Sequence, residues 1–285
     1  MLYRNFATTE AIDAEYDLSQ VVGDPSEYFD SYIEQSARAR DDMNCLLNVR
    51  FGPTIEETLD IFPAKDPDAP ILIFIHGGYW RRLSSKEFSY VARGPVARGI
   101  TVMVCNYALC PKVTLPEITR QCRAAVAWAR ETPIEFNGDR DRIYVSGHSA
   151  GGHLTARVLC TNWVDDYGLP ADTVKAGYAI SGLYDLSPLR YSFVQPMLQL
   201  TEDVIRTESP LFTIPAAAPP MTADVGAEES SEFRRQSAAY IEAWRAAGLT
   251  GSCVEQPGKN HFTAIEEFSD PGSELCERIV AMVTR

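Results

Sequence analysis

The sequence has no long apolar run and comparatively few basic residues. No hydrophobic stretch approaches the roughly 20 residues that a membrane-spanning helix needs, and the first 20 residues lack the basic and apolar regions of a secretion signal. The chain holds 26 Lys and Arg against 39 Asp and Glu, which gives a net charge of −13. Because an acidic surface repels phosphate groups, we expect neither nucleic acid nor an anionic membrane as a partner.

Cysteine pairs and histidine are also scarce. The seven cysteines are odd in number and include no C-x-x-C pair, which predicts neither a disulfide framework nor a zinc site. We therefore expect reduced thiols, a cytoplasmic protein, and no metal or organic cofactor. Only four histidines occur in 285 residues, so an enzyme that needs an imidazole base has few candidates.

Short apolar runs alternate with amphipathic stretches from about Leu59 onward. Both patterns together predict one α/β domain over residues 1–285, with a mostly parallel sheet covered by helices on both faces. Two further stretches, 1–45 and 181–220, are helix-prone or broken by proline, and each is either surface packing or a cap over a site. The expected strands are 71–75, 101–105, 143–145 and 177–180, and the expected helices are 116–130 and 231–247.

A nucleophile is predicted at Ser149. The segment 147–151 reads GHSAG, which matches the G-x-S-x-G motif, and it follows an apolar strand and precedes a helical pattern. In this motif a sharp turn from strand to helix exposes the serine hydroxyl at the edge of the sheet. The small residues two before and two after the serine leave room for the neighbouring chain.

An oxyanion hole is predicted upstream of this serine. The strand 71–75 is followed directly by HGGYW at 76–80. Paired glycines allow backbone N–H groups to approach the carbonyl oxygen on which negative charge develops during acyl transfer. The backbone of Ala150, the residue after the nucleophile, supplies another donor.

The general base is expected to be His261. His76 belongs to the oxyanion turn, His148 directly precedes the nucleophile, and His153 lies four residues beyond it. None of these three is well placed to reach the serine hydroxyl from the opposite side. The order nucleophile, acid, histidine along the chain is that of the α/β-hydrolase fold, which we therefore predict.

The acid that orients the base is expected between Ser149 and His261. Residues 221–233 read MTADVGAEESSEF, and the spacing from Gly226 selects Glu229 after a strand that ends near Val225. Asp224 and Glu228 remain alternatives, although Asp224 would still lie in the strand and Glu228 is one position too early for this spacing. A Glu holds the imidazole tautomer as well as an Asp does.

These motifs resemble the arylformamidase (kynurenine formamidase) branch of the α/β-hydrolases, which neighbours the hormone-sensitive-lipase-like esterases. The similarity extends from about residue 47 to the C-terminus, and Tyr79 stands where related esterases more often carry a third glycine. It rests on HGGYW at 76–80, GHSAGG at 147–152, SGLYDLSPL at 181–189, VGAEESSEFRRQS at 225–237 and NHF at 260–262.

The resemblance implies a triad of Ser149, Glu229 and His261, although the family's usual acid is Asp. It implies oxyanion donors at Gly78, Tyr79 and Ala150, and hydrolysis of the formyl group of N-formylkynurenine. The side chains of Trp80 and Tyr107 are candidates for stacking on an aryl substrate.

Two other functions remain open. A general short-chain carboxylesterase would use the same residues on an ester. A non-catalytic binding protein of this fold usually lacks the serine or the histidine, and both are present here. The expected partner is a small-molecule ester or amide, and the sequence leaves a homodimer open.

Overall fold

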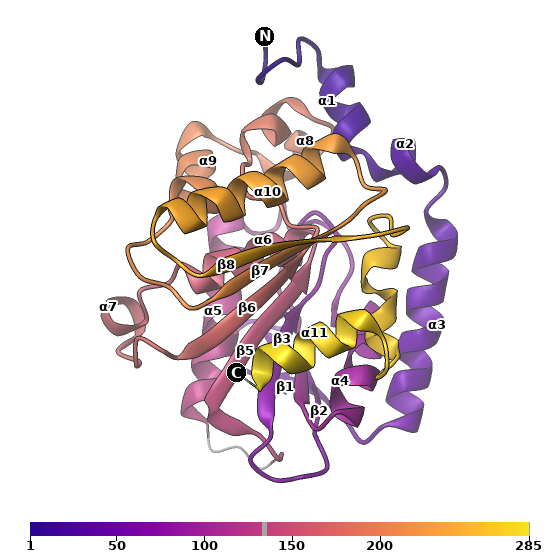
Figure 1. The fold of residues 1–285 in the computed structure, drawn as a ribbon, viewed down its shortest axis with the longest axis vertical. Helices are drawn as coiled ribbons and strands as arrows, with labels where there is room; N and C mark the ends of the chain where they lie inside the picture. The colour runs from indigo at the N-terminus through magenta and orange to yellow at the C-terminus, as the bar shows by residue number, and fades with distance from the viewer. Residues whose placement is uncertain (133–135, 285) are drawn as a thin grey trace.

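A computed structural model describes residues 1–132 and 136–284 of the chain (Figure 1). Its eight strands form one sheet in the order β1-β2-β4-β3-β5-β6-β7-β8, in which β2 is antiparallel to β1 and β4 and the remaining pairs are parallel. The mostly parallel sheet of the prediction is thereby confirmed. The strands are β1 (Leu46–Arg50), β2 (Thr58–Phe62), β3 (Pro70–Ile75), β4 (Thr101–Cys105), β5 (Asp139–His148), β6 (Val174–Ile180), β7 (Met221–Gly226) and β8 (Gly251–Gln256).

The centre of the sheet is apolar on both faces. Every residue of β3 and β4 is buried, as expected for parallel strands that are covered on both sides. β3 lies between β4 and β5. This position brings the chain segments that leave the carboxyl ends of β3 and β5 next to each other.

Helices cover both faces of the sheet. Three of them, α5 (Leu115–Glu131), α6 (Ala150–Leu159) and α10 (Ser231–Ala246), pack on one face, and α4 (Arg93–Ala97) and α11 (Glu274–Val283) pack together on the other. The two predicted helices agree with α5 and α10 to within one residue at each end. In α5 the buried residues recur every three or four positions: Leu115, Ile118, Cys122, Ala125, Val126 and Ala129.

The N-terminal arm, residues 1–45, is helical as expected. It contains α1 (Thr9–Tyr16), α2 (Leu18–Val22) and α3 (Ser26–Asp42), and it runs from the top of the molecule down one side in Figure 1. α1 packs on α10, and α3 packs on the short 3-10 turns Ser85–Glu87 and Ser89–Ala92. The arm therefore contacts elements on both sides of the sheet's carboxyl edge.

The other short elements belong to the chain segments that follow β5, β6 and β8. After α7 (Trp163–Tyr167), the segment 181–220 holds α8 (Gln195–Leu198), α9 (Glu202–Glu208) and two 3-10 turns, Ser187–Tyr191 and Pro210–Phe212. A last 3-10 turn, Thr263–Ser269, follows β8. Connecting segments of this kind can contribute side chains to a functional site while the sheet itself stays unchanged.

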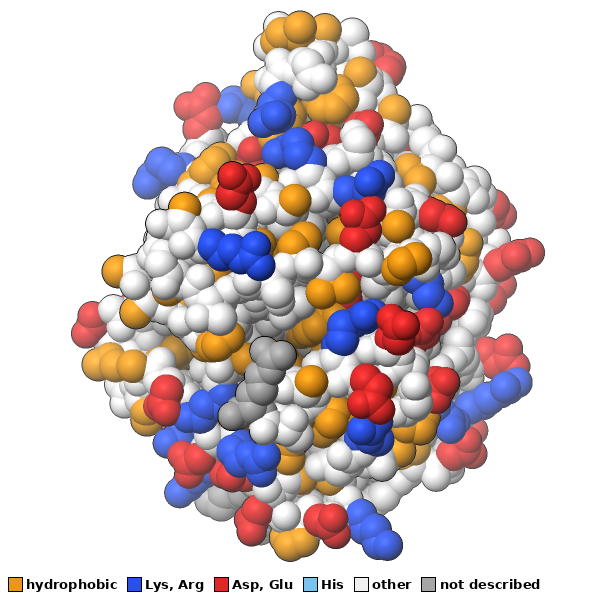
Figure 2. All heavy atoms as spheres, viewed as in Figure 1, with side chains coloured by type: hydrophobic (Ala, Val, Ile, Leu, Met, Phe, Trp, Pro, Cys, Tyr) orange, Lys and Arg blue, Asp and Glu red, His pale blue; other side chains and the backbone are white. Residues whose placement is uncertain are grey.

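The surface carries charges of both signs. On the face shown in Figure 2, acidic and basic side chains are interspersed among small hydrophobic areas. None of the helices in residues 1–132 and 136–284 combines the length and the apolar character that crossing a bilayer requires. The same residues contain no group of three His, Cys, Asp or Glu side chains placed to hold a metal ion.

Candidate active site

Ser149 lies on a strained turn between β5 and α6. Its backbone has φ 57° and ψ −116°, a conformation that residues with a side chain rarely adopt. The turn depends on a close approach of β5 to α6, because a Cβ atom on Gly147 would lie 2.3 Å from the carbonyl oxygen of Gly151. This geometry is that of the nucleophile turn predicted from the sequence.

The oxyanion turn follows β3 and also has unusual backbone angles. Gly78 has φ 111°, and Tyr79 and Trp80 have φ 51° and 55°. A Cβ atom on Gly78 would lie 2.1 Å from the carbonyl oxygen of Arg82, so glycine is required there. Among the described residues, the N–H groups of Gly78, Tyr79 and Ala150 donate no hydrogen bond across the fold, and they remain available to a ligand.

His261 and Glu229 form a close, buried pair. Nδ1 of His261 lies 2.6 Å from Oε2 of Glu229. The other carboxylate oxygen accepts hydrogen bonds from the hydroxyl of Ser181 (2.5 Å) and from the N–H of Gly226 (2.7 Å). Nε2 of His261 has no hydrogen-bond partner in the described part of the chain, and the ring lines the same pocket as Ser149.

The two alternative acids lie elsewhere. Asp224 is fully buried and accepts a hydrogen bond from the hydroxyl of Tyr178, with Arg278 3.9 Å away. Burial raises the pKa of Asp224 to about 6. Glu228 is exposed. Of the three carboxylates that the sequence left open, the structure brings only Glu229 against His261.

The remaining histidines are buried and serve as hydrogen-bond donors to the backbone. Nε2 of His148 donates to the carbonyl of His261 (2.8 Å), and Nε2 of His153 donates to that of Glu208 (2.8 Å). Burial lowers the pKa of His76 to about 4 and that of His153 to about 3. Burial and the neighbouring His261 hold the pKa of His148 well below its ordinary value, so these three rings stay neutral near pH 7.

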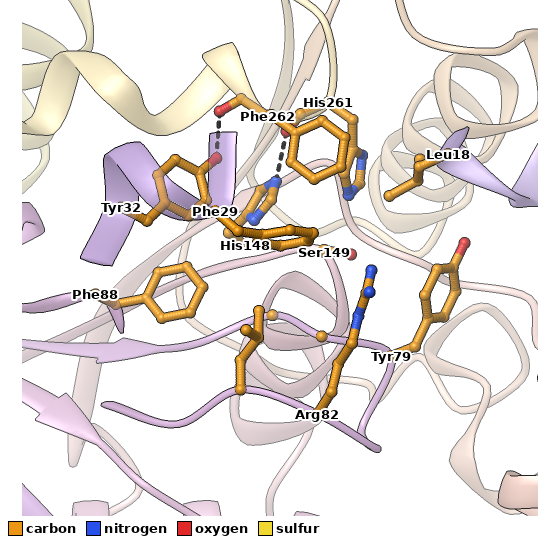
Figure 3. Close-up of a pocket in the computed structure, with 13 residues that line it drawn as sticks. Leu18, Phe29, Tyr32, Tyr79, Arg82, Phe88, His148, Ser149, His261 and Phe262 are labelled. Carbon is orange, nitrogen blue, oxygen red and sulfur yellow. Dashed lines mark hydrogen bonds between the residues drawn. The ribbon is translucent and has the colours of Figure 1, made fainter. Parts of the chain in front are cut away.

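A small pocket lies over Ser149 (Figure 3). Its cavity volume is about 20 Å³, which is room for about one water molecule. Most of its wall is apolar or aromatic, and the backbone of the oxyanion turn forms another part. The lining residues are Leu18, Phe29, Tyr32, Gly77, Gly78, Tyr79, Arg82, Leu83, Phe88, His148, Ser149, His261 and Phe262.

The N-terminal arm is hydrogen-bonded to the three segments that build the site. The hydroxyl of Tyr79 donates to the carbonyl of Tyr16 (2.6 Å), which connects the arm to the oxyanion turn. The hydroxyl of Tyr16 in turn donates to Glu232 (2.8 Å), three residues after Glu229. The hydroxyl of Tyr32 donates to the carbonyl of Phe262 (2.6 Å), next to the base.

The two aromatic residues expected to stack on a substrate are packed inside the protein. Trp80 is fully buried with its ring edge-on to His153, 5.0 Å away. Tyr107 stacks on His76 at 4.1 Å and donates to the carbonyl of that residue. Neither ring is among the described residues that line the pocket.

Several pocket residues were missed at the level of the sequence. Phe29 and Tyr32 come from the arm, Phe262 follows the base, and Arg82 follows the oxyanion turn. Two of them had a usable signal in the sequence. Phe262 is the last residue of NHF, and Arg82 lies two residues after HGGYW. The arm residues gave no such signal, since Phe29 and Tyr32 lie more than 200 positions from Phe262, which both contact.

Known proteins resemble this chain in sequence and in fold. The family model described as BD-FAE matches residues 59–239. A kynurenine formamidase of Danio rerio is 32% identical, over 86% of this chain and 84% of its own. Esterase LipC of Mycobacterium tuberculosis is 32% identical, over 75% of this chain and 58% of its own. A crystal structure from Silicibacter sp. TM1040, for which thioesterase activity is suggested, has a TM-score of 0.82 at 28% identity and covers 96% of this chain and 99% of its own.

Proposed function

The chain is a hydrolase of the α/β-hydrolase fold that belongs to the BD-FAE family, and we propose that Ser149, His261 and Glu229 carry its reaction. The observation that carries this proposal is the contact of 2.6 Å between His261 and Glu229. It leaves Nε2 of His261 without a partner in the described structure, in the pocket that Ser149 also lines. This is the arrangement that a serine nucleophile and its base require.

The reaction proceeds in two steps. The Oγ atom of Ser149 attacks the substrate carbonyl while its proton moves to Nε2 of His261. The C–N bond of a formamide, or the C–O bond of an ester, then breaks as His261 returns that proton to the leaving atom. Water attacks the acyl group on Ser149 by the same route, which releases the acid and restores the hydroxyl. Glu229 holds the imidazole ring and stabilises its charged form.

The oxyanion is bound by three backbone N–H groups, those of Gly78, Tyr79 and Ala150. Their availability supports this assignment, because each lacks another acceptor across the described fold. Fixed donors of this kind stabilise the charge on the tetrahedral intermediate without rearrangement. Gly78 and Tyr79 are held in place by the arm through the hydroxyl of Tyr79.

We propose an aryl formamide of the N-formylkynurenine type as the substrate. The formyl group is the smallest acyl group, and a cavity of about 20 Å³ over Ser149 favours it over a long acyl chain. The aromatic wall suits an aryl leaving group. The 32% identity to a kynurenine formamidase, which extends over most of both chains, supports the same choice.

A general short-chain carboxylesterase is the second candidate. The same residues cleave an ester without change of mechanism, and a relative named as an esterase is 32% identical to this chain. A short acetyl group also needs little space beside Ser149. The two candidates therefore differ in substrate preference and not in catalytic residues.

We also infer that the chain is one domain and that the N-terminal arm is its cap. Leu18, Phe29 and Tyr32 of the arm line the pocket. No described residue of the segment 181–220 does so, although Phe193 packs against the ring of Tyr79 at 5.7 Å. This distribution favours the arm as the element that covers bound substrate.

The deciding experiment compares kcat/KM for N-formylkynurenine with kcat/KM for phenyl acetate and acetanilide, using the wild type and Ser149→Ala. A preference for the formamide supports formamidase function, and rapid ester cleavage with negligible formamide cleavage makes the protein a carboxylesterase. Ser149→Ala is expected to remove nearly all turnover while the unfolding curve stays cooperative. Retained turnover, or failure of a fluorophosphonate to label Ser149, would contradict the proposed mechanism.

A further inference from the structure

The pocket contains one permanent positive charge. Its wall is aromatic or aliphatic apart from the backbone, Ser149, the histidines and Arg82. In Figure 3 the side chain of Arg82 extends into the pocket, with its guanidinium group on the side of Ser149 and Tyr79. An arginine stays charged at every physiological pH, so this side chain supplies a fixed positive charge to the pocket wall.

Arg82 has no anionic partner in the described part of the protein. Its guanidinium group lies 4.8 Å from the ring centroid of Phe29, and its Nε atom is buried without a hydrogen bond. Arg157, another arginine with little exposure, is 3.2 Å from Glu208 and also donates to Thr213. Among the described residues no carboxylate forms an ion pair with Arg82, although Asp17 is near enough to raise its pKa; the Nε atom of Arg81 is also buried without a hydrogen bond.

The backbone of Arg82 is fixed relative to the oxyanion donors. Its N–H group donates to the carbonyl of Gly78 (3.2 Å), as does the N–H of Arg81 (3.1 Å). Burial and the charge of Arg81 lower the pKa of Arg82 by more than the nearby carboxylate of Asp17 raises it. A partly buried guanidinium group gains most from an anion that presents two oxygen atoms to it.

We propose that Arg82 binds a carboxylate on the leaving group of the substrate. This inference rests on the proposed function and narrows the substrate class to aryl formamides or esters that carry an anionic substituent. A formyl group offers no carboxylate of its own, so in a formamide the anion must belong to the aryl side. The pocket, with a cavity of about 20 Å³, must widen to admit the ring, which then packs among the aromatic side chains while its carboxylate pairs with Arg82.

The test uses substrates that differ only in charge. Formamidobenzoates and the matching formamidobenzamides have the same shape, because a neutral amide replaces the carboxylate. All three ring positions are compared, so that the distance from the scissile bond to the carboxylate is varied. For wild type we expect kcat/KM to favour the carboxylate about ten- to hundredfold at one ring position or more, as for a hydrogen bond between charged groups.

Variants then identify the residue responsible. Arg82→Met retains an unbranched stem without charge, and we expect it to abolish the preference for the carboxylate. Arg82→Lys keeps the charge and should retain part of the preference. Arg81→Met is the matched control, since its guanidinium group lies over Phe193 (5.5 Å) and Arg81 is not among the pocket residues. It should leave the preference for the carboxylate in place.

Two outcomes would overturn the inference. One is a wild-type enzyme that cleaves the carboxylate and the amide equally well at every ring position. The other is an Arg82→Met variant that loses the same factor on both substrates, which indicates a structural role on Phe29. If no substrate is cleaved at all, the proposed function fails, and calorimetric binding of benzoate against benzamide still reports on Arg82. Equal or absent binding of the two compounds in that case would also overturn the inference.

Discussion

The hydroxyl of Tyr32 donates a hydrogen bond to the carbonyl of Phe262 across 2.6 Å, and the two residues lie 230 positions apart in the chain. Tyr32 lies on helix α3 of the N-terminal arm, and Phe262 follows His261. Aromatic packing surrounds this bond, since Tyr28 stacks on Phe262 at 4.8 Å and Phe29 meets it edge-on at 5.5 Å. The base is therefore held in part by an element from the other end of the chain.

Removing this hydroxyl should weaken both stability and catalysis. In Tyr32→Phe the carbonyl of Phe262 loses a buried donor, which costs about 1 to 2 kcal/mol of the free energy of unfolding. We expect kcat to fall several-fold because the loop that carries His261 is less firmly held. Urea unfolding and steady-state kinetics measure the two effects.

Tyr28→Phe provides the comparison. Its hydroxyl accepts a hydrogen bond from Asn260 (2.9 Å), also in the loop of the base, but the contact is less buried. The effects of Tyr28→Phe should be smaller in both measurements. Equal losses in the two variants, or an unchanged kcat in Tyr32→Phe, would show that the bond of Tyr32 does not position the base.

Local patterns allowed the parallel strands of the sheet, two helices and the catalytic motifs to be predicted from the sequence, but not the edge strand β1 and its antiparallel neighbour β2. The helix α5 is a clear example, because its apolar spacing and the proline near its start depend only on neighbouring residues. The serine turn and the oxyanion turn are equally local, since each needs small residues at fixed positions.

Features that depend on contacts distant in sequence were not predictable. The direction of the Trp80 side chain depends on the positive φ angles of Tyr79 and Trp80, which the sequence does not reveal. The approach of Phe29 to Phe262 depends on where the arm packs. The spacing from Gly226 favoured Glu229 among three carboxylates, but its contact with His261 depends on the course of the loop after β7.

The identity of the acid can be tested with two matched substitutions. Glu229→Gln and Asp224→Asn each replace a buried carboxylate by an amide, but only Glu229 contacts His261. We expect kcat to fall between about a hundredfold and ten-thousandfold for Glu229→Gln, because the imidazolium loses its counter-charge. Asp224→Asn should lower kcat less than about tenfold. The reverse order in kinetic measurements would assign the acid to Asp224.

Asp224 should instead influence how stability depends on pH. Burial raises its pKa to about 6 in the folded protein from an ordinary value of 3.8, so the folded state binds the proton more tightly than the unfolded state. The free energy of unfolding therefore loses a contribution as the pH rises from about 4 through 6. That contribution is at most about 3 kcal/mol.

Asp224→Asn removes this titration, and the stability difference between the variant and the wild type isolates it from the other carboxylates. We expect the difference to shift in favour of the variant between pH 4 and pH 7. Urea unfolding at several pH values measures it. A difference that is constant with pH, or that shifts in favour of the wild type, would mean that Asp224 is already ionised in the folded protein at acidic pH.

The oxyanion turn provides the last prediction. In Gly78→Ala the new methyl group would lie 2.1 Å from the carbonyl oxygen of Arg82 at a φ of 111°, so the turn must shift and displace its N–H groups. We expect kcat to fall about a hundred- to thousandfold, as when one oxyanion donor is lost. Gly99→Ala is the control, because Gly99 also has a positive φ (79°) but no atom within 4 Å of an added Cβ. That variant should lose about 1 kcal/mol of stability and keep its kcat, since its strain lies away from the site. If Gly78→Ala retained the kcat of the wild type, the backbone N–H groups of this turn would have no part in the mechanism.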